Sequence, residues 1–280
     1  MPAIIFDSKP LVTRMTVELQ KEAARFSKQH HRPARLAQVV AGHDPAAEVY
    51  SRQLVRACQT IGLDCATIAL PFEIEERELR AQVAALNDDA NNDGVVLLLP
   101  LPAHIRQRIV TDVLLPEKDV DGLGSRNAGN LMLGFPSFIP STADVVIAVL
   151  QDAGIPTAGR NAVVVGRSNV GGKPIALVLI RNDATVTICH THTQDLASIT
   201  RTADILVVSI GRPASITAEM VKPGAVVLDA GINAINGKVV GDVDFASVKE
   251  VASFLTPVPG GLGPLTHLML IRHTLLGPQC

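Results

Sequence analysis

The chain is poor in aromatic residues: its 280 residues include no tryptophan and a single tyrosine, Tyr50. Little aromatic surface is therefore available for stacking on nucleic-acid bases. The net charge is −2 and no run of basic residues occurs, so the electrostatic signature of a nucleic-acid or anionic membrane partner is absent as well. We therefore expect no nucleic-acid partner and no membrane partner.

Long hydrophobic segments are missing too. The longest apolar stretches, 145–150 and 175–180, are far too short to span a bilayer. The N-terminus reaches Asp7 without the basic and apolar regions of a signal peptide. These features predict a cytoplasmic protein.

Cysteine is scarce and is not arranged for metal binding. The four cysteines, at 58, 65, 189 and 280, form no Cys-x-x-Cys pair and no zinc-type spacing with histidine. His190 and His192 flank one threonine in a polar segment, where solvated side chains are the simpler interpretation. We expect free thiols and no metal site.

What the sequence does contain is an alternation of short β-branched runs with helical patterns, which predicts parallel sheets covered on both faces. The length suits two domains, with a boundary near 134–142, where prolines and serines interrupt the pattern. The expected strands are 36–40, 65–70, 94–98, 162–165, 185–189, 205–209, 225–229 and 252–255. The expected helices are 13–28, 45–61, 75–87, 143–153, 173–181, 194–201, 244–251 and 265–276.

The segment Thr256-Pro-Val-Pro-Gly-Gly-Leu-Gly-Pro-Leu-Thr266 combines three prolines with three glycines. Proline fixes φ and lacks an N–H, whereas glycine permits positive φ and lets a ligand approach the backbone. The segment lies between a predicted strand and a predicted helix, and open α/β sheets bind ligands at the ends of their strands. A ligand-binding loop is favoured over a simple connector.

A second segment, Val163-Val-Val-Gly-Arg-Ser-Asn-Val-Gly-Gly-Lys-Pro174, reads as a strand, a glycine-containing turn and a helix start. Free N–H groups and the helix dipole at such a start bind phosphate. Ser168 occupies the middle glycine position of the Gly-x-Gly-x-x-Gly pattern, so the match is imperfect. The turn predicts a dinucleotide site at Gly166, Arg167 and Ser168.

The next predicted strand ends in Cys189-His190-Thr191, without the carboxylate that NAD-selective folds place there for the ribose 2′-hydroxyl. Arg167 in the phosphate turn offers a charge for a 2′-phosphate instead. This combination favours NADP over NAD. A solvated Arg167 without a ligand is the alternative interpretation.

These two segments, together with Lys118-Asp-Val-Asp-Gly122, closely resemble the methylenetetrahydrofolate dehydrogenase/cyclohydrolase family. The resemblance extends through Asp93-Gly94, Leu99-Pro-Leu-Pro102 and Gly241-Asp-Val-Asp-Phe245, in order over most of the chain. It implies an N-terminal folate-binding domain at 1–140, completed by a C-terminal helix at 265–280. A Rossmann-type, doubly wound domain for NADP is implied at 141–264, and a homodimer is the family's usual assembly.

The resemblance also implies roles for individual residues. Asp121 is expected to accept hydrogen bonds from the amino and ring N–H groups of the pterin, and Tyr50 is expected to flank the folate; both count as catalytic candidates. The implied substrate-binding residues are Tyr50, Leu54, Leu98, Pro100, Asp121, Gly260, Gly261 and Pro264. The implied cofactor-binding residues are Gly166, Arg167, Ser168, Thr191 and Ile232.

The departures from the family pattern concern chemistry. The bifunctional family carries a serine, a tyrosine and a lysine on one helix, where this chain has Ala47, Tyr50 and Leu54. The family's glutamine before Leu-Pro-Leu-Pro is Leu98 here. Smaller departures are found at Gly124, Ser125, Ser141 and Ala143. Asp44, Pro45 and Gly62 predict the ends of this helix.

Hydride transfer from 5,10-methylenetetrahydrofolate needs mainly positioning of two ligands, because the cation that forms is delocalised over N5 and N10. Hydrolysis of the methenyl product needs general acid–base help, typically about 10²- to 10⁴-fold. The family assigns that help to the lysine and glutamine. We therefore expect a dehydrogenase whose cyclohydrolase activity is lost or very weak.

Three alternatives remain at this point. His43, Arg52 or Arg56 could serve as a substitute acid–base group in a bifunctional enzyme, although arginine stays protonated. The chain could instead be a non-catalytic folate- or nucleotide-binding regulator. Altered substrate choice is a third possibility, because two leucines make the site more apolar.

Overall fold

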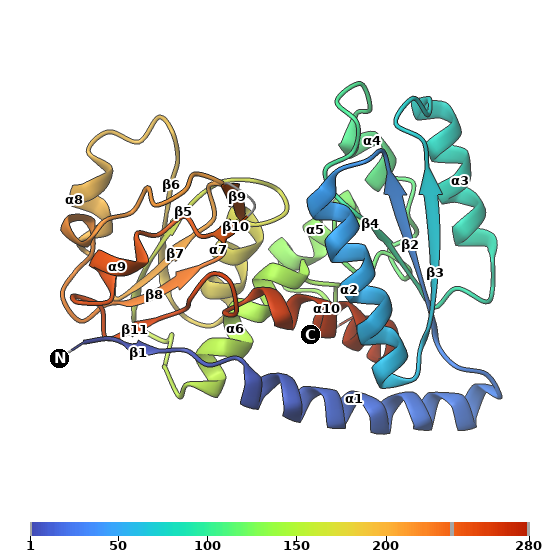
Figure 1. Ribbon diagram of the computed structural model, residues 1–280, viewed down its shortest axis with the longest axis horizontal. Coiled ribbons are helices and arrows are strands. Elements are labelled where there is room, and N and C mark those ends of the chain that lie inside the picture. Colours follow the sequence, from blue (N-terminus) through green and yellow to red (C-terminus); the bar gives the residue numbers. More distant parts are fainter. Residues whose placement is uncertain (1, 236–237, 279–280) are drawn as a thin grey trace. The chain divides into compact units, whose positions relative to one another are not determined.

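The computed structural model describes residues 2–235 and 238–278, which divide into two compact units (Figure 1). The first unit combines the residues up to Val12 with Thr142–Thr266, and the second combines Thr13–Ser141 with the residues from His267 onward. Each unit contains a parallel sheet, which confirms the predicted two-domain α/β fold class.

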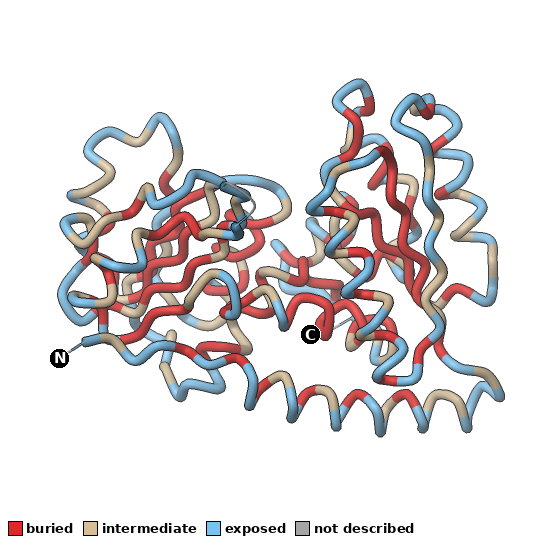
Figure 2. The backbone as a smooth tube through the Cα atoms, viewed as in Figure 1, coloured by how far each residue is buried: buried red, intermediate tan, exposed pale blue. Residues whose placement is uncertain are grey.

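The second unit is built on a three-stranded parallel sheet in the order β3-β2-β4, with β2 at Arg35–Ala41, β3 at Asp64–Leu70 and β4 at Gly94–Leu97. On one face, Ala37 and Val39 belong to a buried apolar cluster that α3 (Glu76–Asp88) and α4 (Gln107–Thr111) help to form. Helix α2 (Pro45–Ile61) lies on the other side of the sheet (Figure 1). Figure 2 shows how completely β2 and β4 are buried.

Helix α2 begins and ends as the sequence predicts. The Asp44 carboxylate caps it by accepting the Ala47 N–H at 2.8 Å, and Pro45 occupies the first turn. Gly62 closes it in the left-handed conformation at φ +99°, where its N–H reaches the Cys58 carbonyl. The helix therefore holds a fixed register against the sheet.

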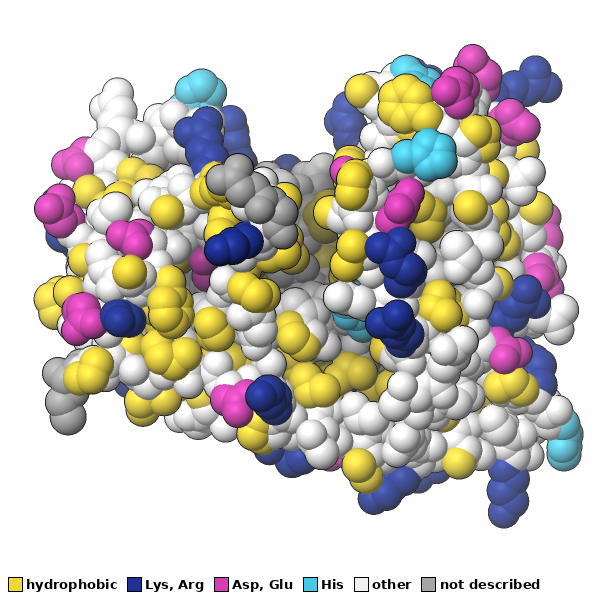
Figure 3. Space-filling model, viewed as in Figure 1, with side chains coloured by type: hydrophobic (Ala, Val, Ile, Leu, Met, Phe, Trp, Pro, Cys, Tyr) yellow, Lys and Arg dark blue, Asp and Glu magenta, His cyan; other side chains and the backbone are white. Residues whose placement is uncertain are grey.

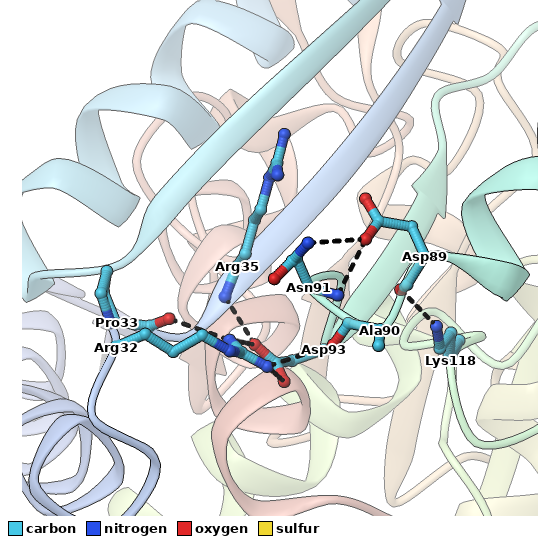
Figure 4. Close-up of polar contacts among 8 residues, drawn as sticks. All are labelled: Arg32, Pro33, Arg35, Asp89, Ala90, Asn91, Asp93 and Lys118. Carbon is cyan, nitrogen blue, oxygen red and sulfur yellow. Dashed lines mark hydrogen bonds and ion pairs between the residues drawn. The ribbon is translucent and has the colours of Figure 1, made fainter.

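The amino ends of β2 and β4 are joined by a polar cluster (Figure 4). Arg32 binds both carboxylate oxygens of Asp93 at 2.7 and 2.8 Å, and the Arg35 N–H donates to the same carboxylate at 2.8 Å. The paired carboxylate raises the pKa of Arg32. Lys118 donates to the carbonyls of Asn87 and Asp89, so the loop that starts at Lys118 is anchored to the end of α3.

The first unit contains a six-stranded sheet in the order β1-β11-β8-β7-β5-β6. Its strands pair in parallel, and their side chains form a continuous apolar core (Figure 2). The chain moves from β5 outward to β6 and then back to β7 on the other side of β5, which is the doubly wound pattern. The strands are β1 Ile4–Ile5, β5 Asn161–Val165, β6 Thr185–Cys189, β7 Ile205–Val208, β8 Val226–Asp229 and β11 Phe254–Leu255.

The remaining elements include several that the sequence pattern does not predict, such as β1, α4, α5 and the β9–β10 hairpin. The predicted helices at 194–201 and 244–251 are shorter than expected. No helix among residues 2–235 and 238–278 is long and apolar enough to cross a membrane. The other bounds are α1 Lys9–His30, α5 Ser125–Leu133, α6 Ser141–Asp152, α7 Gly172–Arg181, α8 Leu196–Thr200, η1 Ala218–Met220, β9 Asn233–Ile235, β10 Lys238–Val240, α9 Phe245–Val248 and α10 Gly263–Leu276.

Charged side chains of both signs are interspersed over the face of the molecule drawn in Figure 3. No field of a single sign covers that face, in line with the net charge of −2. Of the four cysteines, Cys58, Cys65 and Cys189 are free thiols, and Cys280 lies outside the described residues.

Candidate active site

In the second unit, helix α2 presents an apolar face to the sheet. Leu54 is fully buried at 0% exposure, and Ala47 and Ser51 are buried on the same face. Tyr50 is half-buried at the margin of this face, one helical turn before Leu54.

Leu98 lies on the same side of the sheet as α2. Its N–H continues the β4 ladder by donating to the Val39 carbonyl at 2.9 Å, and it is 5% exposed. Because side chains alternate along a strand, Leu98 shares a face with Gln38 on β2, whose amide reaches the Ser51 carbonyl of α2. Leu54 and Leu98 thus bring two hydrocarbon side chains to the α2 side of the sheet.

Pro100 follows Leu98 at an exposed position, and the Leu99–Pro100 peptide is cis. The predicted substrate-binding residues of the second unit are called the Tyr50–Asp121 half-site from here on: Tyr50, Leu54, Leu98, Pro100 and Asp121.

Asp121 lies in the loop that follows the anchored Lys118. Its carboxylate accepts the Ser141 N–H at 2.9 Å, and burial raises the pKa of Asp121 to about 6. The next residue, Gly122, has φ +59°, and a Cβ there would collide with the Phe138 carbonyl. The final glycine of Lys-Asp-Val-Asp-Gly is therefore required by backbone packing, and it sets the direction of Asp121.

Asp119 is a residue whose role the sequence analysis missed. It is 1% exposed and accepts the N–H groups of Leu123 and Gly124 and the Asn127 side-chain amide, while burial raises its pKa. The sequence holds no local signal that separates the two carboxylates, because residues two apart in an extended segment fall on the same side; their different hydrogen-bond partners distinguish them. Asp119 thus holds the loop from within, whereas the hydrogen bonds of Asp121 come from Ser141 at the start of α6.

In the first unit, the predicted Pro/Gly loop at 256–266 follows β11 without regular structure as far as α10, which begins at Gly263, two residues before the predicted helix start at 265. Gly260 adopts φ +98°, and its carbonyl accepts the Ser8 hydroxyl at 2.6 Å. A Cβ on Gly261 would collide with the Pro257 carbonyl. Pro264 occupies the first turn of α10, where a missing N–H costs no helical hydrogen bond.

The predicted phosphate turn lies between β5 and α7. Gly166 has φ +133°, and a Cβ there would collide with the Ser209 carbonyl; a Cβ on Gly172 would collide with the Gly166 carbonyl. Ser168 accepts the Gly171 N–H at 3.0 Å through its hydroxyl, so it stabilises the turn while remaining exposed. Arg167 is exposed beside it.

Two further predicted cofactor residues follow other strands of the same sheet. Thr191 is exposed just after β6, and Ile232 is 64% exposed after β8. Because all these strands are parallel, Gly166, Arg167, Ser168, Thr191 and Ile232 share the carboxyl edge of the sheet, the edge at which open α/β folds bind ligands. We call these five residues the strand-end half-site.

The sequence analysis missed two buried aspartates that organise this edge. Asp229 accepts the N–H groups of Gly231, Asp242 and Val243, and burial raises the pKa of Asp229 to about 6. Asp242, which is 0% exposed, accepts the N–H groups of Ile210, Gly211 and Arg212 and the Asn233 amide. Together they fix the loops that follow β7 and β8.

The half-sites correspond to two family models. Residues 6–121 match the catalytic domain of tetrahydrofolate dehydrogenase/cyclohydrolase, and residues 140–278 match its NAD(P)-binding domain. The chain belongs to this family. A curated relative, the bifunctional protein FolD of Bordetella avium, is 48% identical over 276 residues, which cover 98% of this chain and 97% of the relative.

Solved structures of the family share the fold. The bifunctional FolD enzyme of Campylobacter jejuni has a TM-score of 0.94 at 37% identity, covering 98% of each chain. The Trypanosoma brucei enzyme, whose structure contains an NADP cofactor and an inhibitor, has a TM-score of 0.93 at 33% identity, covering 98% of this chain and 97% of the other. The predicted family, oxidoreductase class, folate substrate class and nicotinamide dinucleotide cofactor are confirmed at this level.

Proposed function

We propose that this family member is an NADP-dependent 5,10-methylenetetrahydrofolate dehydrogenase whose cyclohydrolase activity is lost or very weak. One observation carries the proposal: Leu54 and Leu98 put hydrocarbon where the family pattern has a lysine and a glutamine, and both are buried on the α2 side of the sheet. A leucine side chain neither transfers a proton nor orients water. Hydride transfer needs neither a proton-transfer group nor an oriented water, because it depends on holding the two ligands in place.

The folate part of the proposal rests on Asp121. The Asp121 carboxylate accepts hydrogen bonds from the backbone N–H and the side chain of Ser141, and a carboxylate has about four acceptor positions, so capacity remains for paired pterin donors. Tyr50 offers a flat ring one turn from Leu54. In this proposal Leu98 and Pro100 are assigned to folate binding in the second unit, and Gly260, Gly261 and Pro264 are assigned to it in the first.

The NADP part of the proposal rests on the strand-end half-site. Arg167 and Ser168 lie exposed in the turn before α7, whose N-terminal N–H groups favour phosphate. No carboxylate ends β6, so nothing there selects an unmodified ribose 2′-hydroxyl. When bound, the nicotinamide supplies the hydride acceptor, and Thr191 and Ile232 are assigned to its binding surface.

The substitute acid–base residues considered above lie at the solvent. The side chains of His43 and Arg52 are 84% and 61% exposed, and both approach the carboxylate of Glu48. Arg56 is exposed as well. Arg52 and Arg56 are on the outer side of α2 and His43 precedes the helix, whereas Leu54 is on its buried side, which disfavours a relocated proton shuttle among them.

We also infer a cytoplasmic homodimer, as the family resemblance implies. The β6 edge of the six-stranded sheet is unpaired among the described residues, and Ile188 on β6 and Ile180 on α7 are 42% and 53% exposed. Such an edge suits a second copy of the chain. Sedimentation of the wild type and of Ile188→Lys tests this, since a monomeric wild type contradicts the inference.

The dehydrogenase assay tests the function directly. Purified protein is given methylenetetrahydrofolate with NADP⁺ or NAD⁺, and methenyl formation is followed. The proposal expects turnover with a clear preference for NADP⁺. No methenyl formation with either cofactor would falsify the dehydrogenase assignment and favour a non-catalytic binding protein.

A further inference from the structure

His267 makes an unusual contact with Tyr50 in the second unit. It lies in the second turn of α10, and its ring stacks on the Tyr50 ring with centroids 4.1 Å apart and planes inclined by 28°. The histidine is only 6% exposed. The implied folate-flanking tyrosine is therefore one half of a stacked pair.

The hydrogen bonds of His267 fix which nitrogen carries the proton. One ring nitrogen is hydrogen-bonded to the Tyr50 backbone, and Nε2 is buried without a hydrogen-bond partner among the described residues. The bonded nitrogen is therefore Nδ1, which donates its proton to the Tyr50 carbonyl. Burial lowers the pKa of His267 to about 4, so the ring is neutral at pH 7 and Nε2 presents a bare lone pair.

A buried acceptor without a donor is costly, and no described residue donates a hydrogen bond to Nε2. His267 also cannot take over the role of an ammonium group, because its only proton is committed to the Tyr50 carbonyl. The position calls for a ligand that brings an N–H or O–H group to it.

Reduced folates, the substrate class of the proposed function, carry one such donor to which no residue has yet been assigned. With the pterin amino group and the lactam N–H assigned to Asp121, and with N5 and N10 both alkylated in the methylene form, N8–H is the remaining donor of the reduced ring. A fully oxidised pteridine has a lone pair at N8 instead of a hydrogen. A lone pair at Nε2 would therefore attract the reduced ring and repel the oxidised one.

We propose that His267 is a specificity-determining residue of the Tyr50–Asp121 half-site, whose Nε2 accepts a hydrogen bond from N8–H of reduced folates while the stacked Tyr50 ring holds it in place. This inference rests on the proposed function for the identity of the ligand. It goes beyond that function in naming the residue that distinguishes reduced from oxidised pteridines.

Nitrogen-15 NMR of the histidine-labelled protein tests the contact in the wild type, and a variant is needed only to assign the resonance. The Nε2 resonance of His267, assigned by its absence from the His267→Gln spectrum, should move when tetrahydrofolate is added under anaerobic conditions and stay in place with folic acid. A resonance that ignores tetrahydrofolate, or that moves equally with both compounds, contradicts the proposal. Because the titration needs binding and no turnover, a dehydrogenase failure with an intact shift overturns only the proposed function.

Affinities give a second readout. His267→Leu should weaken tetrahydrofolate binding about fivefold, the size of one neutral hydrogen bond, with folic acid binding unchanged or tighter. His267→Gln, whose amide oxygen is also an acceptor, should recover part of the loss. His104→Gln, at an exposed histidine that contacts the Ile74 carbonyl, is the matched control and should change neither affinity. Equal losses for both folates in His267→Leu would reduce the residue to a packing role.

Discussion

The two half-sites differ in what their buried groups do. At the strand-end half-site, Asp229 and Asp242 are buried charges, and each is saturated with backbone N–H donors, so they shape loops and are not available to a ligand. At the Tyr50–Asp121 half-site, the buried positions on the α2 side are the hydrocarbons Leu54 and Leu98, while Asp121 accepts hydrogen bonds from Ser141. Under the proposed function, the first arrangement serves cofactor binding, and the second lacks a group for proton transfer while Asp121 recognises the substrate.

The largest effect is expected when the Asp121 carboxylate, the acceptor of the Tyr50–Asp121 half-site, is removed. Asp121→Asn replaces a carboxylate with an amide that cannot accept from two pterin donors at once, so kcat/KM for methylenetetrahydrofolate should fall by about 100-fold or more. The Kd for NADP should not change. Steady-state kinetics and cofactor titration measure both, and Asp64→Asn, at an exposed aspartate, is the control. A variant with wild-type folate kinetics would remove Asp121 from the site.

The second prediction concerns the return of polar side chains to the two leucine positions of the Tyr50–Asp121 half-site. Leu54→Lys combined with Leu98→Gln should raise the rate of methenyl hydrolysis at least tenfold. This minimum lies below the roughly 10²- to 10⁴-fold that general acid–base catalysis typically contributes. Leu54 is fully buried, so the lysine also lowers the thermal midpoint. The single variants are the controls, and each should gain less than the pair. A stable double variant that gains nothing would mean that hydrolysis is limited elsewhere.

The strand-end half-site is probed through its one exposed arginine. Arg167→Gln should raise KM for NADP about tenfold and leave KM for NAD nearly unchanged, because only NADP carries the 2′-phosphate. Arg126→Gln, at another exposed arginine, provides the control. Equal effects on the two cofactors would show that Arg167 does not contact that phosphate.

The smallest effect concerns pH. Asp121 must be ionised to accept pterin donors, and its pKa is raised to about 6, so kcat/KM for the folate should decline below pH 6 by up to tenfold per unit. Stability has the opposite sign. A pKa raised above the unfolded value of about 4 favours the folded state at low pH, and this contribution is lost as pH rises through 6. Asp121→Asn should therefore not lower the thermal midpoint at pH 7.5.

The sequence predicted the elements whose signals are local. The capping of α2 by Asp44 and Gly62 and the phosphate turn at Gly166 depend on residues adjacent in the chain, and both are found as expected. The Pro/Gly loop could be placed for the same reason. The motifs singled out the glycines at 122 and 166 in the sequence. The reason that glycine is required there, a close approach of another backbone segment, is seen only in the fold.

What the sequence could not show depends on distant contacts. The His267–Tyr50 stack joins residues 217 positions apart, and no local pattern distinguishes it from an ordinary core histidine. Asp119 and Asp121 look equivalent in the sequence, yet one is saturated inside its loop and the other is not. The contact between Gln38 on β2 and the backbone carbonyl of Ser51 on α2 likewise depends on how the helix packs on the sheet.

The most direct test of the account supplies methenyltetrahydrofolate alone to the purified wild-type protein and follows its decay beside a protein-free sample. The account predicts that the two decays coincide, or nearly so, at protein concentrations that give rapid dehydrogenase turnover. Decay far above the protein-free rate would contradict it, because a site with leucine at 54 and 98 would then be moving protons by a group that the account assigns to no residue.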